Sequence, residues 1–288
     1  MQVDNAIIMA AGVSSRFAPL SYEKHKAMIE VKGEIIIERQ IKQLIEAGIP
    51  KIFVVTGYKA EQFEYLQDKY DVEIIYNPDY CLRNNNSSIY AVKDLLRNSY
   101  VCSADNYFSK NPFLADVDEA YYAAVYANGD TKEWCMREDE EGYICSVNIG
   151  GKDAWYMLGH TFWSQEFSEK FLEIMLKEYD LPQTAQKLWE NILIEHLDTL
   201  KMRIRKYEPN QIFEFDTLDE LRQFDKSYVD DSRSSIIKAI ADELKVTEAD
   251  IVNIVAIKDS TVFANGFEFD CGLEHYMYTY DSKKIKMF

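Results

Sequence analysis

Short apolar runs alternate with helix-type patterns through the first third of the chain. Runs typical of buried strands occupy residues 6–9, 51–56, 72–76 and 100–103. Apolar residues at three- and four-residue spacing between them predict helices over 34–47, 60–70 and 89–97. Ser87 and Ser88 are expected to cap the last of these helices. The alternation predicts an α/β fold with a parallel sheet, whose ligands bind at the carboxyl ends of the strands.

The pattern changes after residue 119. Several short β-type runs between residues 119 and 163 predict a mixed or antiparallel extension of the sheet, which often forms a wall of a substrate pocket. Residues 164–198 are expected to form two helices broken near Pro182. Strands over 202–207 and 212–215 then precede a helix over 218–224.

The pattern of apolar and polar residues changes again in the last 60 or so residues of the chain. An amphipathic helix is predicted over 234–244 and a short second helix over 248–254, followed by two or three strands rich in Phe and Tyr. We place a domain boundary near residue 229. This predicts a main domain over residues 1–228 and a small α+β appendage over 229–288.

Small and basic residues follow the first predicted strand. The small residues are Ala10, Ala11, Gly12, Ser14 and Ser15. Small side chains let a ligand lie close to the backbone, and consecutive N–H groups before a helix form a cradle for an anion. Arg16, Lys24 and Lys26 add three positive charges within eleven residues. We interpret the stretch as a site for a nucleoside triphosphate; an ordinary turn between a strand and a loop is the alternative.

Two aspartates, Asp105 and Asp216, each follow a predicted strand. Two carboxylates at the ends of strands can hold Mg²⁺, which prefers oxygen ligands and shares them with substrate phosphates. The alternative is that each Asp caps a helix or turn, which suits Asp216 because Thr217 and a predicted helix follow it. Together with the basic loop, the pair favours the metal site.

Composition and charge narrow the class of protein. The chain of 288 residues carries a net charge of −17, which argues against nucleic acid or an anionic membrane as a partner. Its five cysteines show no CxxC spacing and indicate neither a zinc site nor a disulfide framework. We find no signal-peptide pattern and no run of 18 apolar residues. These features predict a soluble, cytoplasmic protein.

Several motifs carry a family resemblance. The stretch AAGVSSRFAPLSYEKHKAMIEV resembles the signature of nucleotidyltransferases that act on sugar phosphates. A closer resemblance, to bacterial CTP:phosphocholine cytidylyltransferases, covers about residues 3–228. Its motifs, in chain order, are VVTGYKAEQFEYL, YNPDYCLRNNNSSIYAVKDLL, SADNYFSKNPF, DTKEW, GHTFW, LWEN and IFEFDTLDEL.

This resemblance implies a Rossmann-like nucleotidyltransferase fold with a mixed central sheet, and the conversion of CTP and phosphocholine to CDP-choline and pyrophosphate. It implies Mg²⁺ ligands at Asp105 and Asp216, with Glu214 as a helper. It places Arg16 and Lys26 on the phosphates. It also places Asn85 and Ser88 near the nucleoside. The phosphate of the acceptor attacks directly, so catalysis would consist of positioning and charge stabilisation.

Two positions depart from the family pattern. Relatives often carry Gly where Ser14 stands, and a serine costs about 1 kcal/mol there if the backbone needs a positive φ. Many relatives carry Pro at the position of His25, which we expect to be an exposed loop residue without a role. Neither change removes a charge or a metal ligand.

Recognition of choline requires aromatic faces and carboxylates, because a quaternary ammonium has no N–H to donate. The motifs favour Trp134 and Trp189, with Glu133 and Glu190 beside them. Packing is the preferred explanation for four weaker candidates, which are Tyr122, Trp155, Tyr156 and Trp163. Rival acceptors are 2-aminoethylphosphonate and a sugar phosphate, and a catalytically silent nucleotide-binding protein is the rival from another class.

Cytidylyl transfer does not account for the predicted appendage. Residues 241–288 loosely resemble the start of a choline-kinase-type N-lobe, but the sequence holds no catalytic loop of such a kinase. We therefore expect a truncated remnant that serves packing or homodimer contacts. An unrelated α+β appendage is the alternative.

Overall fold

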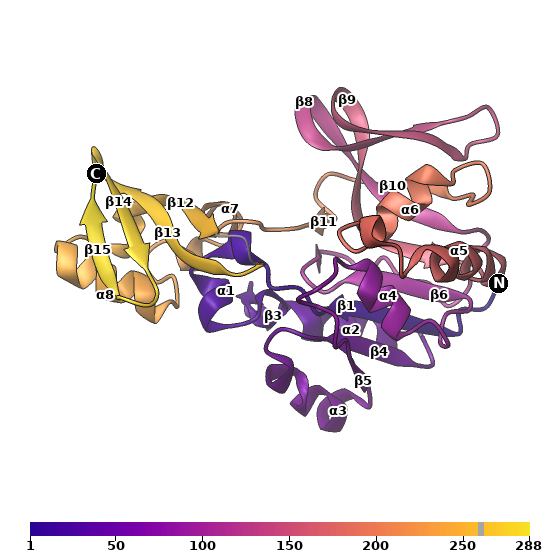
Figure 1. Cartoon of the computed structure of the whole chain (residues 1–288), viewed down its shortest axis with the longest axis horizontal. Coiled ribbons are helices and arrows are strands. Elements are labelled where there is room, and N and C mark those ends of the chain that lie inside the picture. The colour runs from indigo at the N-terminus through magenta and orange to yellow at the C-terminus, as the bar shows by residue number, and fades with distance from the viewer. Residues whose placement is uncertain (259–261) are drawn as a thin grey trace. The chain divides into compact units, whose positions relative to one another are not determined.

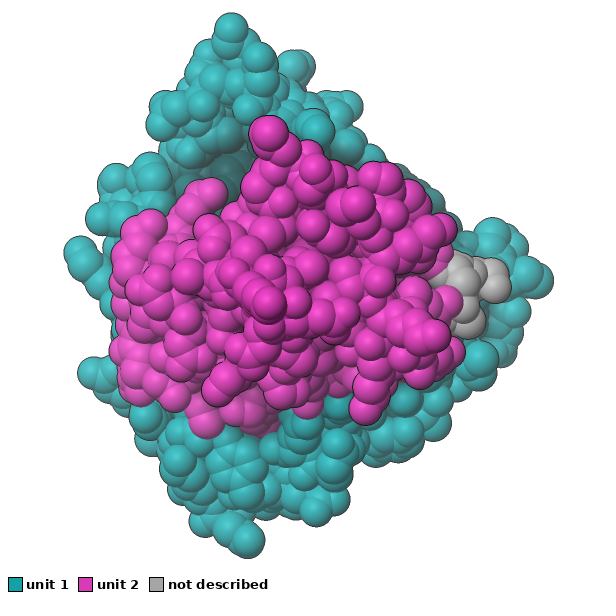
Figure 2. All heavy atoms as spheres, turned by 90° about the vertical axis from the view of Figure 1, so that its left-hand side faces the viewer, with its two compact units in different colours: residues 1–12, 36–214 teal, residues 13–35, 215–288 magenta. Residues whose placement is uncertain are grey.

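The chain divides into two compact units, each built from two separate segments of the sequence (Figure 2). Unit 1 comprises Met1–Gly12 and Ile36–Glu214, and unit 2 comprises Val13–Ile35 and Phe215–Phe288. The structure, a computed structural model, describes residues 1–258 and 262–288. The chain thus leaves unit 1 directly after the glycine of the predicted phosphate loop. The domain boundary near residue 229 stays a prediction.

Unit 1 contains a mixed sheet of seven strands in the order β10-β8-β9-β6-β1-β4-β5 (Figure 1). Its strands and the short β7–β11 ladder are β1 (Asn5–Ala10), β4 (Ile52–Thr56), β5 (Glu73–Tyr76), β6 (Ser99–Ser103), β7 (Tyr107–Phe108), β8 (Tyr121–Glu138), β9 (Ile144–Trp163), β10 (Arg203–Tyr207) and β11 (Ile212–Phe213). In the seven-stranded sheet β9 runs opposite to the other six strands. The expected α/β fold with a mixed central sheet is confirmed.

The helices of unit 1 connect these strands. They are α2 (Ile36–Glu46), α3 (Tyr65–Tyr70), α4 (Asn86–Ala91), α5 (Gln165–Glu178) and α6 (Trp189–Glu195), with the 3₁₀ helices η3 (Ala60–Phe63) and η4 (Pro182–Thr184). Alternate residues of a strand face opposite sides of the sheet. Ile7 and Val101 therefore point to one face, where they join a buried cluster with Phe171 of α5 and Ile192 of α6.

Unit 2 contains the remaining elements. These are η1 (Ser15–Phe17), α1 (Leu20–Glu23), η2 (Lys26–Met28), β2 (Glu30–Val31), β3 (Glu34–Ile35), α7 (Leu218–Phe224), η5 (Lys226–Tyr228), α8 (Ser235–Leu244), η6 (Glu248–Asp250), β12 (Ile251–Lys258), β13 (Ala264–Cys271), β14 (Glu274–Thr279) and β15 (Lys284–Met287). Strands β12 to β15 form an antiparallel sheet in sequence order (Figure 1). Ile237 and Ile240 of α8 are buried, as are Phe267 and Phe269 of β13.

The antiparallel extension of the sheet predicted between 119 and 163 is confirmed, and its short runs belong to two long paired strands, β8 and β9. Two predictions about elements were wrong. The helix expected over 248–254 is a single 3₁₀ turn, η6, that leads into strand β12. Ser87 and Ser88 lie inside α4 and do not cap it, because the helix begins earlier, at Asn86.

A membrane-spanning helix needs both sufficient length and an apolar character. Among the described residues, no helix is both long and apolar enough to cross a membrane.

Candidate active site

The loop after β1 is held by a close backbone approach from the end of β4. The Tyr58 amide donates to the Ala11 carbonyl at 3.1 Å. A Cβ on Gly57 would lie 2.9 Å from that carbonyl oxygen and 2.7 Å from the Tyr80 Cβ. Gly57 is therefore required for this approach. A Cβ on Gly12, in contrast, would meet no atom of the described residues within 4 Å.

Ser14 adopts the left-handed conformation, with φ 50° and ψ 42°, immediately before η1. Glycine occupies this region without the steric cost that a Cβ brings. Ser14 therefore stands at a positive φ, where a serine costs about 1 kcal/mol relative to glycine. The turn orients η1, which carries Arg16.

Arg16, Lys26 and Asp216 come together within unit 2. The Asp216 carboxylate lies 2.6 Å from Arg16 Nη1 and 3.4 Å from Lys26 Nζ. Lys26 is buried, with 3% of its surface exposed, whereas Arg16 reaches solvent. A buried ammonium needs a carboxylate partner, because an unpaired buried charge is strongly destabilising. Asp216 is thus the counter-ion of both predicted phosphate-binding residues.

Asp216 does not cap α7. Thr217 is the N-cap, with its side chain accepting from the Glu220 amide in a reciprocal capping box. The capping explanation for Asp216 is therefore excluded.

His25 is not the exposed loop residue that the sequence suggested. It is buried, and its Nδ1 accepts a hydrogen bond from the Ala27 amide at 3.1 Å. This bond caps η2, the 3₁₀ turn that begins at Lys26. His25 thus fixes the backbone of the buried lysine.

Asp105 and Glu214 both belong to unit 1. Asp105 follows β6, and the short β7–β11 ladder pairs Tyr107 with Phe213, so that Glu214 lies opposite Asn106. Asn106 Nδ2 contacts a Glu214 carboxylate oxygen at 3.5 Å. The ladder therefore brings Glu214 next to Asn106, the residue that follows Asp105. Pairing of Asp105 with Asp216, which belongs to unit 2, stays a prediction.

The Asn-rich loop before α4 is joined to the start of α6 by side-chain hydrogen bonds. Asn85 accepts from the Trp189 amide at 2.7 Å and donates to Glu190 at 3.1 Å. Ser88 is buried, and its hydroxyl accepts from Asn77 at 3.2 Å. Two motifs that lie about a hundred residues apart thus form one structure. A contact of Asn85 or Ser88 with a nucleoside stays a prediction.

Glu190 is a half-buried carboxylate between two neutral donors. Besides Asn85, the Tyr122 hydroxyl donates to it at 3.3 Å. Burial raises the pKa of Glu190 to about 6, and the hydrogen bonds from Asn85 and Tyr122 only partly oppose this rise. The protein therefore keeps an ionisable group in a place where its charge is costly, which is typical of functional sites.

Trp189 lies in the core of unit 1, with 1% of its surface exposed. Tyr122 stacks on its ring at 5.8 Å between centroids, and Trp163 packs edge-on at 5.0 Å. This packing gives Trp189 a structural role, because it orients both Tyr122 and the neighbouring Glu190. Direct contact between Trp189 and a substrate stays a prediction.

Glu133 and Trp134 lie on β8, near a bulge where the pairing with β9 shifts register. Trp134 is half-buried, whereas Glu133 is exposed. Burial first, and then the charges of Glu133 and Glu214, raise the pKa of Tyr156. The charge of Glu214 also contributes to the raised pKa of Tyr122, which is mainly due to burial. Tyr122 thus lies within electrostatic reach of Glu190 and Glu214, and Tyr156 lies within reach of Glu133 and Glu214.

Sequence reasoning placed Tyr122 and Tyr156 only among the weaker candidates. The charges of nearby carboxylates contribute to the raised pKa of both tyrosines. The spacing of residues in the sequence cannot show that a tyrosine lies near Glu190 or Glu133. Packing does account for Trp163, which is fully buried and donates from Nε1 to Thr161 Oγ1 at 3.0 Å. The ring of Trp155 already has a cation of the protein over it, since Lys206 Nζ lies 5.6 Å from the ring centroid.

Known proteins share both the fold and the order of these motifs. The family model described as "MobA-like NTP transferase domain" matches residues 6–178. The chain therefore belongs to the family of MobA-like NTP transferases, and the protein is a nucleotidyltransferase.

Its relatives include two cytidylyltransferases. The chain is 34% identical to choline-phosphate cytidylyltransferase from Streptococcus pneumoniae, over 77% of this chain and 96% of the relative. It is 35% identical to 2-aminoethylphosphonate cytidylyltransferase from Lancefieldella rimae, over 78% of this chain and 93% of the relative. The solved structure of CTP:phosphocholine cytidylyltransferase from Streptococcus pneumoniae superimposes with a TM-score of 0.75 at 33% identity, covering 79% of this chain and 99% of that one.

Proposed function

We propose that this protein transfers a cytidylyl group from CTP to phosphocholine, releasing pyrophosphate. The similarity to two cytidylyltransferases over more than nine tenths of their length supports the cytidylyl transfer. The observation that carries the choice of acceptor is the Tyr122–Glu190 pair, in which the hydroxyl of an aromatic ring donates to a carboxylate. Aromatic faces and carboxylates are the groups that attract a quaternary ammonium.

The cations Arg16 and Lys26 are the proposed partners of the triphosphate. In the structure both are bound to Asp216, so binding of phosphate oxygens exchanges one anion for another at a place already built for anions. Guanidinium and ammonium groups stabilise the charge that develops on the departing pyrophosphate.

The carboxylates Asp105, Glu214 and Asp216 are the proposed ligands of Mg²⁺. The donor set fits a hard divalent cation, since each residue offers carboxylate oxygens, and Asn106 beside Glu214 adds an amide. Mg²⁺ bound there would neutralise charge on the phosphates during transfer. Asp216 would then release Arg16 and Lys26 to the nucleotide.

The acceptor's cation is proposed to lie against Tyr122, Tyr156 and Glu190. A cation and a carboxylate about 5 Å apart gain about 3 kcal/mol at an effective dielectric constant of 20. Because the pKa of Glu190 is raised to about 6, this carboxylate is ionised at pH 7.5 and can supply that attraction.

The 2-aminoethylphosphonate reaction is the second candidate. It is favoured by the 35% identical relative, and carboxylates such as Glu190 could accept N–H bonds from a primary ammonium. A methylated ammonium offers no such donor, so the two acceptors can be distinguished chemically.

A pyrophosphate-release assay tests the proposal. The protein, CTP and Mg²⁺ are incubated with phosphocholine, phosphoethanolamine, 2-aminoethylphosphonate or glucose 1-phosphate. The highest kcat/KM is expected for phosphocholine, with loss of turnover when a chelator removes the metal. A higher value for 2-aminoethylphosphonate would favour the second candidate. Calorimetric CTP binding without turnover of any acceptor would identify a silent nucleotide-binding protein.

A further inference from the structure

The phosphate loop is defined as residues 13–35 and the C-terminal segment as residues 229–288. Both belong to one folded unit. Residues 13–35, which carry Arg16 and Lys26, and residues 215–288 together make up unit 2. The alignments to the two cytidylyltransferases leave 23% and 22% of this chain unmatched, although they cover nearly all of each relative. This chain therefore contains material that those relatives lack.

We infer that residues 229–288 are a positioning element for the phosphate loop, with Glu23 and the Tyr22–Tyr280 stack as the links. The inference rests on the proposed function, since it assigns the loop to CTP. It attributes to the C-terminal segment a role in nucleotide affinity that the sequence did not suggest.

The first link is the carboxylate of Glu23 at the N-terminus of α8. Glu23 accepts a hydrogen bond from the Ser234 hydroxyl, and it accepts two more from the Ser235 amide at 2.9 Å and the Ser235 hydroxyl at 2.5 Å. A carboxylate at a helix N-terminus satisfies an amide that has no partner within the helix, and it interacts favourably with the helix dipole. Glu23 ends α1 and directly precedes Lys24, so this contact fixes the middle of the loop.

The second link is a stacked pair of rings. Tyr22 and Tyr280 lie 3.8 Å apart between centroids with an interplanar angle of 9°. Tyr22 is 49% exposed, so its ring is held mainly from one side. An exposed aromatic stacked on a buried one orders the segment that carries it, and such pairs stabilise beyond the area they bury.

The loop is also held at both ends. Near its start, η1, which carries Arg16, lies against β12. Near its end, the Tyr228 hydroxyl donates to the Glu30 carbonyl at 2.6 Å, and Arg233 pairs with the Glu30 carboxylate at 3.4 Å. The C-terminal segment thus contacts the loop at η1, between the two phosphate-binding cations and, through Arg233, after Lys26.

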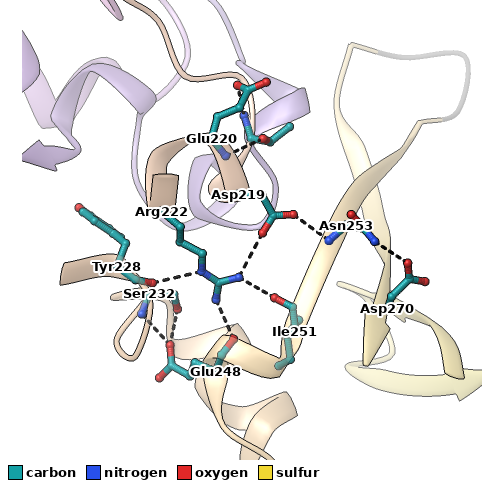
Figure 3. A network of polar contacts seen from close by, with 10 residues as sticks. Asp219, Glu220, Arg222, Tyr228, Ser232, Glu248, Ile251, Asn253 and Asp270 are labelled. Carbon is teal, nitrogen blue, oxygen red and sulfur yellow. Dashed lines mark hydrogen bonds and ion pairs between the residues drawn. The ribbon is translucent and has the colours of Figure 1, made fainter. Parts of the chain in front are cut away.

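The C-terminal segment is joined to α7 by a network of hydrogen bonds (Figure 3). The buried guanidinium of Arg222 donates to the carbonyls of Tyr228 at 3.2 Å, Ile251 at 2.6 Å and Glu248 at 2.7 Å (Figure 3). Asp219 accepts from the Asn253 amide at 2.7 Å. Since helix α7 fixes the beginning of β12, the segment can serve as a firm support for the loop.

The affinity for CTP should then depend on how often the loop is docked. If only a fraction of molecules has the loop in place, the apparent dissociation constant rises by the inverse of that fraction. Saturating CTP restores the docked state, so kcat stays nearly constant. A general loss of stability would not produce this combination.

Three variants and one matched control test the inference in the full chain. Glu23→Gln removes the charged acceptor, whereas Tyr22→Leu and Tyr280→Leu each remove one ring of the stack. Tyr276→Leu is the control, because Tyr276 of β14 stacks on Phe269 of β13 at 5.3 Å, so that this change removes a ring pair within the sheet itself. Each test variant is expected to raise the KM for CTP about tenfold, with kcat and the KM for phosphocholine within twofold of the parent. The control is expected to leave all three constants within twofold.

The double variant Tyr22→Leu/Tyr280→Leu separates the stack from other effects. Because each single change removes the same ring pair, the double variant should show little more than a single tenfold effect. Equal KM increases in the Tyr276→Leu control, or multiplying effects in the double variant, would overturn the inference.

Amide hydrogen exchange provides a readout that needs no substrate. Tyr280→Leu is expected to speed exchange in residues 13–35, whereas Tyr276→Leu leaves those residues as they are in the parent. Unchanged exchange in 13–35 for Tyr280→Leu refutes the positioning role. If the parent protein turns over no acceptor, the proposed function fails, and exchange still decides whether the C-terminal segment holds the loop.

Discussion

Glu190→Gln is the substitution that most directly tests the proposed recognition of a cation. The pKa of Glu190 is raised from 4.5 to about 6, chiefly by burial. Because the folded protein then binds this proton more tightly than the unfolded chain, the contribution of Glu190 to the free energy of unfolding decreases as pH rises from about 4.5 to about 6. A shift of about 1.5 pKa units corresponds to about 2 kcal/mol.

The stability of the variant should therefore depend on pH in a defined way. At pH 4 the protonated glutamate and the glutamine are nearly equivalent. At pH 7.5 the Glu190→Gln protein should be more stable than the parent by about 2 kcal/mol. Urea unfolding of both proteins at pH 4, 5, 6 and 7.5 measures this difference, and the use of the difference cancels the other groups that titrate in the range.

Acceptor binding should change in the opposite sense. Loss of an attraction of about 3 kcal/mol raises the KM for phosphocholine about 100-fold or somewhat more. The matched control is 3,3-dimethylbutyl phosphate, the neutral isostere of phosphocholine. The parent enzyme should strongly prefer phosphocholine, whereas in Glu190→Gln this preference should fall about 100-fold. An unchanged ratio of the two kcat/KM values would show that Glu190 does not bind the cation.

Three further predictions concern the loop and the metal ligands. Ser14→Gly should raise the free energy of unfolding by about 1 kcal/mol, because φ is 50° at this position, and thermal unfolding checks this. Gly57→Ala should lower both thermal stability and CTP affinity, since the added Cβ would lie 2.9 Å from the Ala11 carbonyl oxygen. Gly12→Ala should keep the parent's melting temperature, because a Cβ there meets no described atom within 4 Å, and it should lower only the CTP affinity measured by calorimetry. Asp105→Asn and Asp216→Asn should each lower kcat at least 100-fold with the circular dichroism spectrum unchanged, and a variant with normal turnover would remove that residue from the metal site.

The parallel strands of unit 1 were predictable because their apolar runs are short, continuous and bounded by turn residues. Strand β1 covers the run predicted over 6–9, and β4 covers most of 51–56. Buried parallel strands need apolar residues on both faces, so their pattern survives without any knowledge of the partners. The same reasoning predicted the loops at the strand ends, and hence the candidate site.

The misreadings of strands β12, β8 and β9 arose at bulges. In β12, Ile251 and Ile254 are both buried at a spacing of three residues, which imitates a helix. Asn253 between them has a φ of 52°, and the pairing with β13 shifts register there. The bulge turns the strand by one residue, so that both isoleucines face the same side. Register shifts within β8 and β9 likewise broke two long strands into apparent short runs.

Contacts between distant segments left no local pattern in the sequence. Glu23 and the Ser235 amide are 212 residues apart, and Lys32 donates to Asp225 across 193 residues. Motifs identify the chemistry of Arg16 and Lys26 because that chemistry depends on residue type and order. The partners that hold the loop also include Ser235 and Tyr280, which lie beyond the family match that ends at residue 178. The affinity of this protein for its nucleotide should therefore vary with substitutions in a segment that the family motifs do not include.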